Sequence, residues 1–152
     1  MANKISNRVK IKKQKINKLV WLQIKNGEDL HGALTNYCLK NDIKAGLICA
    51  VGALKNAKFS FYDQAKKIFL PENINKPLEI LSCLGNISLK DGQPFVHAHL
   101  AVSDKAGRVY GGHLEKGTII FACECAIIQA SGELLNRRFD KLTGLNLWDF
   151  GK

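Results

Sequence analysis

The sequence has 152 residues, 46% of them hydrophobic and 24% charged, with a formal net charge of +10, which is typical of one globular domain with a basic surface. The chain has no apolar run of the roughly 18 residues needed to cross a bilayer, and its basic N-terminus lacks the apolar segment of a signal peptide. Five cysteines without Cys-x-x-Cys spacing predict reduced, buried thiols. Together these features lead us to expect a soluble cytoplasmic protein with no membrane contact.

The positive charge is concentrated at the N-terminus. Residues 1–18 contain seven basic and no acidic residues, which leaves 16 basic and 13 acidic residues, a net charge of +3, for the rest of the chain. Such an arm can neutralise several phosphates and bind DNA in a salt-sensitive, largely sequence-independent way. A solvated leader that aids solubility is the alternative. The nucleic-acid candidates are Arg8, Lys10, Lys12, Lys13 and Lys15.

The remaining residues, 19–150, are predicted to form a single domain in which strands outnumber helices. A first strand is expected over residues 19–25, and the acidic turn before residue 30 favours the start of a helix that runs to about Lys40. His31 is expected on the surface of this helix, and Gly52 marks a bend or a close backbone approach. Further strands are expected over residues 45–54, 57–62, 68–70, 78–84, 87–89, 95–102, 109–114 and 118–128, with two short strands around a turn at 140–144.

A β-hairpin is predicted from residues 95–102, which alternate between apolar and polar, and from the strand that starts at Val109. The turn at residues 104–107 is typical of a three-residue loop, residues 105–107, with Gly107 in the left-handed conformation. In that register the numbers of opposed residues sum to 212. A two- or four-residue loop would change the parity and move His113 to the core side of the sheet.

This register brings three histidines to one face of the hairpin. His97 and His99 lie about 6.6 Å apart along their strand, and His113 lies roughly 5 Å across from His99. Ala101 and Gly111 share this face and leave a hollow beside the histidines. The opposite face is apolar and is expected to enter the core through Val96, Ala98, Leu100, Val102, Tyr110 and Leu114.

Three neutral imidazoles with an open fourth position suit Zn²⁺ or another divalent transition metal. We therefore predict a metal site at His97, His99 and His113. The alternative is that they are ordinary strand histidines, two facing solvent and one filling a gap near the glycine pair. If the metal were catalytic, the site would also need a proton-transfer group, for which Glu79 and Glu124 are the candidates. Strand glutamates more commonly face solvent or pair with lysine.

Two stretches resemble the signature of the PPC domain, which is conserved in plants and prokaryotes. They are Gly92-Gln93-Pro94-Phe95-Val96-His97-Ala98-His99 and Ser103-Asp104-Lys105-Ala106-Gly107-Arg108-Val109-Tyr110-Gly111-Gly112-His113-Leu114. Weaker motifs extend the resemblance over about residues 19–150, among them Gly27-Glu28-Asp29-Leu30, Val51-Gly52-Ala53-Leu54, Pro77-Leu78-Glu79-Ile80-Leu81 and residues 140–145.

The resemblance implies an α/β (α+β) fold, with a mixed, mostly antiparallel sheet packed on one main helix and assembled as a homotrimer. The chain resembles the stand-alone prokaryotic members of the family. It lacks the AT-hook of the plant proteins and has Lys76-Pro77-Leu78 in place of a plant Gly-Arg-Phe stretch. Two functions are therefore expected to compete. One is a DNA-binding or regulatory module with a three-histidine metal site, and the other is a hydrolase or lyase that uses an open three-histidine zinc site. A trimer without an ion is a third possibility.

Overall fold

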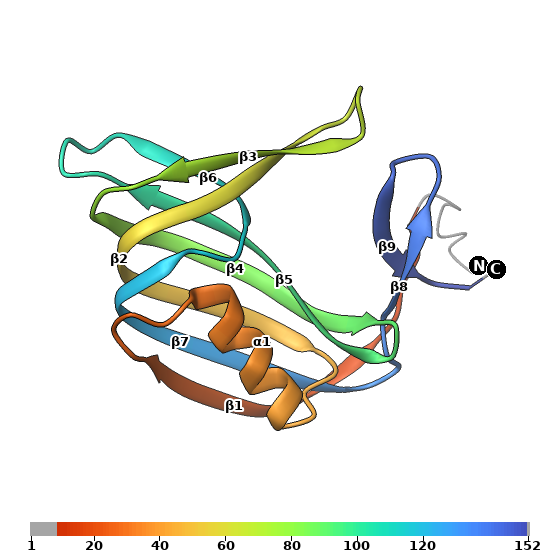
Figure 1. The fold of residues 1–152 in the computed structure, drawn as a ribbon. Helices are drawn as coiled ribbons and strands as arrows, with labels where there is room; N and C mark the ends of the chain where they lie inside the picture. Colours follow the sequence, from red (N-terminus) through yellow and green to blue (C-terminus); the bar gives the residue numbers. More distant parts are fainter. Residues whose placement is uncertain (1–8, 152) are drawn as a thin grey trace, which may run out of the picture.

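The computed structural model describes residues 9–151, which form one helix and nine strands (Figure 1). No helix in this range is long and apolar enough to cross a membrane. The elements in chain order are β1 (Gln14–Ile24), α1 (Leu30–Lys40), β2 (Gly46–Asp63), β3 (Ile68–Ile74), β4 (Leu78–Lys90), β5 (Gln93–Ser103), β6 (Val109–Leu114), β7 (Ile119–Gly132), β8 (Asn136–Asp140) and β9 (Leu145–Asp149).

The strands form one curved sheet in the order β1-β7-β2-β6-β5-β4-β8-β9, with β3 paired to β2. All pairings are antiparallel except the single β4–β8 pair at Leu89 and Asn136, so the expected mixed, mostly antiparallel sheet is confirmed. The long strand β2 pairs with both β4 and β6, which curls the sheet back on itself. The β8–β9 hairpin projects from one end of the sheet (Figure 1).

Helix α1 spans Leu30–Lys40, as predicted, and covers one face of the sheet (Figure 1). Asp29 caps its N-terminus, because the Asp29 carboxylate accepts hydrogen bonds from the backbone N–H groups of Gly32 and Gly117. The expectation that His31 lies on the helix surface is wrong. The helix packs against β5, which leaves His31 half-buried beside the main chain of Val96.

The predicted first strand begins too late. β1 starts at Gln14, five residues before the predicted start at residue 19, because residues 14–18 pair with the C-terminal end of β7. The lysines in this stretch are exposed on an edge strand, where charged side chains are common and protect against further pairing. Part of the predicted basic arm is therefore sheet.

The two strands predicted over residues 45–54 and 57–62 are one strand, β2. Its pairing with β7 is irregular around Leu54 and Asn56, but backbone pairing resumes on both sides, so the strand continues. The close approach predicted at Gly52 is confirmed. A Cβ atom there would lie 2.2 Å from the Ala122 carbonyl oxygen, and the φ of +141° favours glycine.

The sheet has a core face and an outer face. The core face and α1 enclose side chains such as Leu34, Ile48, Leu100 and Ile127, all at most 2% exposed. The outer face carries exposed apolar side chains that lie next to one another across the strands. One cross-strand row on this face runs through Trp21, Ala126, Cys49, Leu84, His99 and His113.

The β5–β6 hairpin has the predicted register. His99 faces His113 and Ala101 faces Gly111, so the opposed numbers sum to 212. The three-residue loop is present, with Gly107 at φ +76° and with the Asp104 N–H donating to the Arg108 carbonyl at 3.0 Å. The hairpin therefore has the parity that puts all three histidines on the outer face.

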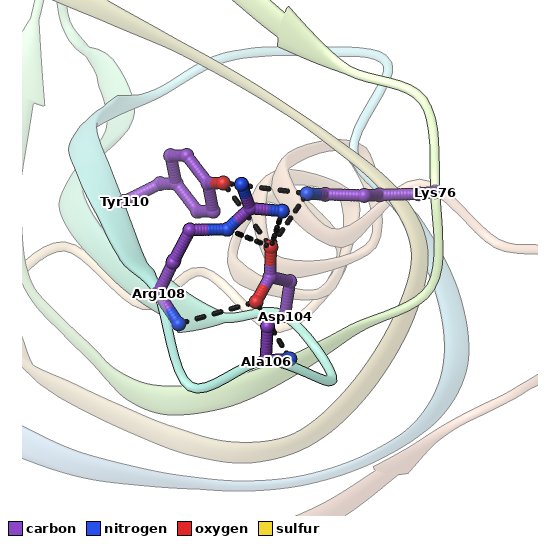
Figure 2. A network of polar contacts seen from close by, with 5 residues as sticks. All are labelled: Lys76, Asp104, Ala106, Arg108 and Tyr110. Carbon is purple, nitrogen blue, oxygen red and sulfur yellow. Dashed lines mark hydrogen bonds and ion pairs between the residues drawn. The ribbon is translucent and has the colours of Figure 1, made fainter.

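A polar network holds this turn (Figure 2). The Asp104 side chain is 2% exposed. Its Oδ2 accepts from Lys76 at 2.7 Å, from the Arg108 guanidinium at 2.9 Å and from Tyr110 at 3.1 Å. Its Oδ1 accepts from the backbone N–H groups of Ala106 and Arg108. The Lys76 hydrogen bond is the largest of several contacts that hold the pKa of Asp104 well below its usual range.

We expect the Asp104→Asn variant to be less stable than the wild type at pH 7, because an amide cannot replace a carboxylate that accepts from two cations. The folded-state pKa of Asp104 is lowered, so the stability it contributes is complete above the unfolded-state pKa of about 4 and is lost as the pH falls below it. Urea unfolding of both proteins should therefore give a free-energy difference that narrows between pH 4 and pH 2.

The matched control for this experiment is Asp42→Asn, since Asp42 forms an exposed ion pair with Lys44 and is itself 74% exposed. The Asp42 variant should resemble the wild type at every pH. A difference between wild type and the Asp104 variant that stays constant with pH would contradict the assignment.

Candidate metal centre

Three histidines from one hairpin converge on the outer face. The ring centroids are 5.3 Å apart for His97 and His99, 4.9 Å for His97 and His113, and 5.4 Å for His99 and His113. One nitrogen from each ring lies within 4.8 Å of the others. His99 is exposed, while His97 and His113 are half-buried. Three imidazole nitrogens at this spacing could hold one transition-metal ion.

The two half-buried rings are neutral near pH 7. Burial, the neighbouring Arg137 charge and the other two histidines lower the pKa of His97 to about 4. Burial also lowers the pKa of His113, against the opposing effect of Glu115. A metal binds the neutral form of imidazole, so these environments keep the ligand nitrogens free of competing protons.

Arg137 on β8 orients His97 from the side. Its Nη2 donates to Asn86 Oδ1 at 3.0 Å and lies 3.2 Å from His97 Nδ1. A guanidinium only donates, so His97 Nδ1 accepts and the neutral ring carries its hydrogen on Nε2. A neutral imidazole that binds metal through one nitrogen carries its hydrogen on the other. Metal binding at Nδ1 would therefore replace the Arg137 contact, and binding at Nε2 would move the hydrogen to Nδ1, so either mode would release the Arg137 N–H from His97.

Arg137 is itself fixed from several directions. Nε donates to Ser88 Oγ at 2.8 Å and Nη1 donates to the Asn146 carbonyl at 2.9 Å. The guanidinium lies over the rings of Phe95, at 5.0 Å, and Trp148, at 5.9 Å. Burial lowers the pKa of Arg137, but a guanidinium stays protonated at neutral pH. Arg137 is therefore a rigid positive charge beside the histidines.

The histidines open into a cavity of about 530 Å³. Its walls come from the hairpin, from β2 and β3, and from the C-terminal β8–β9 hairpin. The lining residues are Ser60, Phe61, Tyr62, Gln64, Phe69, Lys90, Phe95, His97, His99, Gly112, His113, Arg137, Gly144, Leu145, Asn146 and Leu147. Aromatic and aliphatic side chains predominate, with two cations at one side.

A second hollow, of about 470 Å³, lies on the other side of His99. Ala101 and Gly111 line it, as the sequence predicts, together with Leu84 and Val109. Leu84 is 60% exposed and Val109 is 62% exposed. The hollow therefore opens onto the apolar outer face.

The two carboxylates predicted as proton-transfer candidates lie elsewhere. Glu79 on β4 lines a different cavity near Asp104, and Glu124 on β7 lines one near Trp21. Glu115 is the carboxylate close to the histidines. Its Oε1 accepts from Ser60 Oγ at 2.7 Å, and its charge offsets part of the burial effect that lowers the pKa of His113. Glu115 lies one residue beyond the end of β6, so strand alternation gives no signal for it in the sequence.

The basic candidates for nucleic-acid binding are spread over the N-terminal segment. Arg8 lies outside the described residues. Lys12 Nζ donates to the Leu134 carbonyl at 3.3 Å, Lys10, Lys13 and Lys15 are exposed, and Lys15 belongs to β1. These side chains are separate from the histidine cavity.

All five cysteines are free thiols. Four are buried, and burial raises the pKa of Cys38 and Cys123 to about 11 and that of Cys83 and Cys125 to about 12. Cys49 differs from the prediction, because its position on β2 places it on the exposed outer face. The buried thiols are protonated and act as small apolar side chains.

The sequence model of the Plants and Prokaryotes Conserved (PCC) domain matches residues 11–131. The chain belongs to this family, and the resemblance of its motifs to the PPC signature is thereby confirmed. The bifunctional proteins GlmU of two Synechococcus strains are similar in sequence. That of strain JA-3-3Ab is 35% identical over 125 residues, which make up 81% of this chain and 19% of that protein. That of strain JA-2-3B'a(2-13) is 33% identical over 84% of this chain. The chain spans about a fifth of the length of these curated relatives.

Three solved structures share the fold. The metal-containing protein AF0104 from Archaeoglobus fulgidus is 39% identical with a TM-score of 0.88, and the match covers 92% of this chain and 99% of that one. A PPC protein from Pyrococcus horikoshii is 34% identical with a TM-score of 0.86, over 90% and 94% of the two chains. A protein from Bacteroides thetaiotaomicron, provisionally described as DNA-binding, is 25% identical with a TM-score of 0.82, over 90% and 97%.

Proposed function

We propose that this chain is a metal-binding module of the PCC family, in which His97, His99 and His113 hold one divalent transition metal, zinc by preference. The observation that carries the proposal is the convergence of three imidazole nitrogens within 4.8 Å, in the register that the turn at Gly107 specifies. The similarity to a metal-containing protein from Archaeoglobus fulgidus supports it. Buried thiols on the core face are consistent with a cytoplasmic location.

Elemental analysis of the purified protein tests this proposal. After incubation with zinc and removal of excess metal, we expect about one ion per chain. Manganese, iron, cobalt, nickel and copper should be measured in parallel, since imidazole ligands suit several of these ions. A protein that retains no transition metal would contradict the proposal.

A binding module is favoured over a metal-dependent hydrolase or lyase. An open metal site in a large cavity is compatible with catalysis, but the reaction would need a positioned proton-transfer group. Within residues 9–151, no Asp or Glu lines the histidine cavity, and Glu115 is engaged by the Ser60 hydroxyl.

We also propose that the chain assembles as a homotrimer through the outer face of the sheet. Trp21 is 75% exposed, Leu47 58% and Phe121 60%, and all three lie on this face. Several large apolar side chains exposed on one face are typical of an interaction site. Because His99 lies in the same cross-strand row as Trp21, the assembly would bring the metal site close to a subunit boundary.

Light scattering after gel filtration should give a mass three times the 16.9 kDa of one chain. The Leu47→Glu variant should have a lower mass than the trimer, since the substitution places a charge in the proposed interface. Leu142→Glu is the matched control, because Leu142 is 83% exposed in the β8–β9 turn and should not alter the mass. A monomeric wild type would contradict the assembly.

The basic N-terminal segment is proposed to bind DNA without sequence preference. Removing residues 1–13 leaves β1 intact, because that strand starts at Gln14, and removes five basic residues. If each of these residues contacts one phosphate, raising the salt from 50 to 200 mM would weaken DNA binding on the order of 10²- to 10³-fold. We expect the truncated protein to lose both the binding and its salt dependence in an electrophoretic mobility assay.

A full-length variant with Lys10, Lys12 and Lys13 changed to glutamine separates the effect of charge from that of chain length in this assay. This variant should lose most of its affinity for DNA. Undiminished binding by the truncated protein would instead assign the DNA surface to the folded body, where Lys15 and Lys18 remain exposed on β1.

A further inference from the structure

The cavity beside the histidines carries positive charge that no acidic side chain in its described wall offsets. Lys90 and Arg137 line it, and within the described residues no acidic side chain does. The histidines are neutral ligands, so a bound divalent metal keeps its full charge of +2. Together the ion and the two side chains would place four positive charges around one half-enclosed space.

Arg137 has a hydrogen-bond donor left for a ligand. A guanidinium carries five N–H groups. Without metal, four of them point to acceptors within the described part of the chain, namely Ser88 Oγ, the Asn146 carbonyl, Asn86 Oδ1 and His97 Nδ1. A metal on His97 would release the last of these, so Nη1 and Nη2 would each have one N–H free for a ligand. The contacts to Ser88, Asn146 and Asn86 hold the guanidinium in place, so its charge and free donors are preorganised beside the histidines.

The rest of the cavity is largely apolar, with Gln64 and Asn146 as its side-chain amides. Phe69 stacks against His113, with ring centroids 5.2 Å apart, and Phe95 lies beneath the Arg137 guanidinium. The two hydroxyl groups in the wall already donate elsewhere, Tyr62 to the Thr143 carbonyl and Ser60 to Glu115, each at 2.7 Å. A largely apolar wall suits a ligand with an apolar body, and the donors of Arg137 and Lys90 can satisfy the two oxygens of a carboxylate.

We propose that the cavity binds a small organic acid with an apolar body, whose carboxylate faces both the histidine-bound metal and Arg137. Lys90 adds to the positive potential, and the aromatic walls contact the body of the acid. This inference rests on the proposed metal site and specifies its ligand class. The carboxylate would offset charge that the cavity itself does not balance.

Cobalt-loaded protein provides a direct test, because the visible spectrum of bound Co²⁺ responds to a change in its ligands. The probes are acetate, benzoate and phenylacetate, each compared with its neutral amide, and inorganic phosphate. We expect at least one of the acids to change the spectrum with a dissociation constant below about 1 mM and to bind about tenfold or more tightly than its amide.

Variants then assign the effect to the cavity. Arg137→Gln should weaken binding of the acid by about tenfold or more, and Lys90→Gln by a few fold. Lys66→Gln is the matched control, because Lys66 is 71% exposed outside the cavity, and it should bind the acid like the wild type. If Arg137→Gln does not fold, Lys90→Gln and the comparison of acid with amide still decide the question.

The outcomes separate the two proposals. Failure to take up cobalt overturns the metal site and this inference with it. Uptake of cobalt with no spectral response to any acid, with equal responses to acids and amides, or with a response to phosphate alone leaves the metal site standing and overturns the organic-acid ligand.

Discussion

The His99→Ala variant should bind metal about a hundredfold or more weakly than the wild type, and should be purified nearly free of it. The free energy of a protein zinc site is of the order of 10 kcal/mol and is shared among few ligands, so one lost imidazole removes a large part of it. His99 is the best position for the test because it is exposed, and truncating its side chain leaves no hole in the core. Elemental analysis and competition with a chromophoric chelator would measure the loss.

The unfolding temperature gives a second measurement of metal binding, because binding and folding are thermodynamically linked. Metal that binds only the folded state stabilises it, by about 2.7 kcal/mol when free metal is at 100 times the dissociation constant. The wild-type unfolding temperature should therefore rise with added zinc and fall with a chelator, while that of His99→Ala should respond much less to either. His31→Ala is the matched control, since His31 lies on α1 outside the cluster and its loss should leave metal content unchanged. Full stoichiometry in His99→Ala would contradict the assignment.

The Gly111→Ala variant should lose more than about 2 kcal/mol of stability and also bind metal more weakly. A Cβ atom at Gly111 would lie 2.3 Å from the Leu100 carbonyl oxygen, so strands β5 and β6 would have to separate. Those two strands carry the three histidines, and their separation would pull His113 away from His99. Chemical unfolding and metal titration would measure the two effects.

Gly27→Ala is the control for the glycine effect alone. Gly27 has a φ of +86°, and a Cβ atom added there would meet nothing within 4 Å, so alanine should destabilise by only about 1 kcal/mol. Metal binding should be unchanged, because Gly27 lies in the turn before α1. If Gly111→Ala and Gly27→Ala were equally stable, β5 and β6 could accommodate the added methyl group without strain, which would contradict the prediction.

The histidine cluster could be predicted because it depends on local rules. A turn of known length fixes the parity of a hairpin, and parity decides which side chains share a face. Glu115 lies one residue beyond the end of β6, where strand alternation no longer fixes the direction of a side chain. Glu79 and Glu124 lie in strands, but strand composition does not say which cavity a side chain faces.

Arg137 could not be predicted in this way. It comes 24 residues after His113 and reaches the site only because β8 pairs in parallel with β4 at Leu89. A single backbone pair of this kind leaves no periodic pattern in the sequence. The start of β1 was missed for a related reason, since a lysine-rich segment resembles a solvated arm until its partner strand is known. The half-burial of His31 likewise depends on where α1 packs.

The C-terminal hairpin has a consequence for how the proposed site could be altered. The family model ends at residue 131, yet the hairpin formed by β8 and β9 supplies Arg137 and residues 144–147 of the cavity wall. The three histidines and this part of the wall thus come from different hairpins. We expect substitutions in residues 136–149 to change which acid binds in the proposed site, while the β5–β6 register and the arrangement of the histidines stay the same.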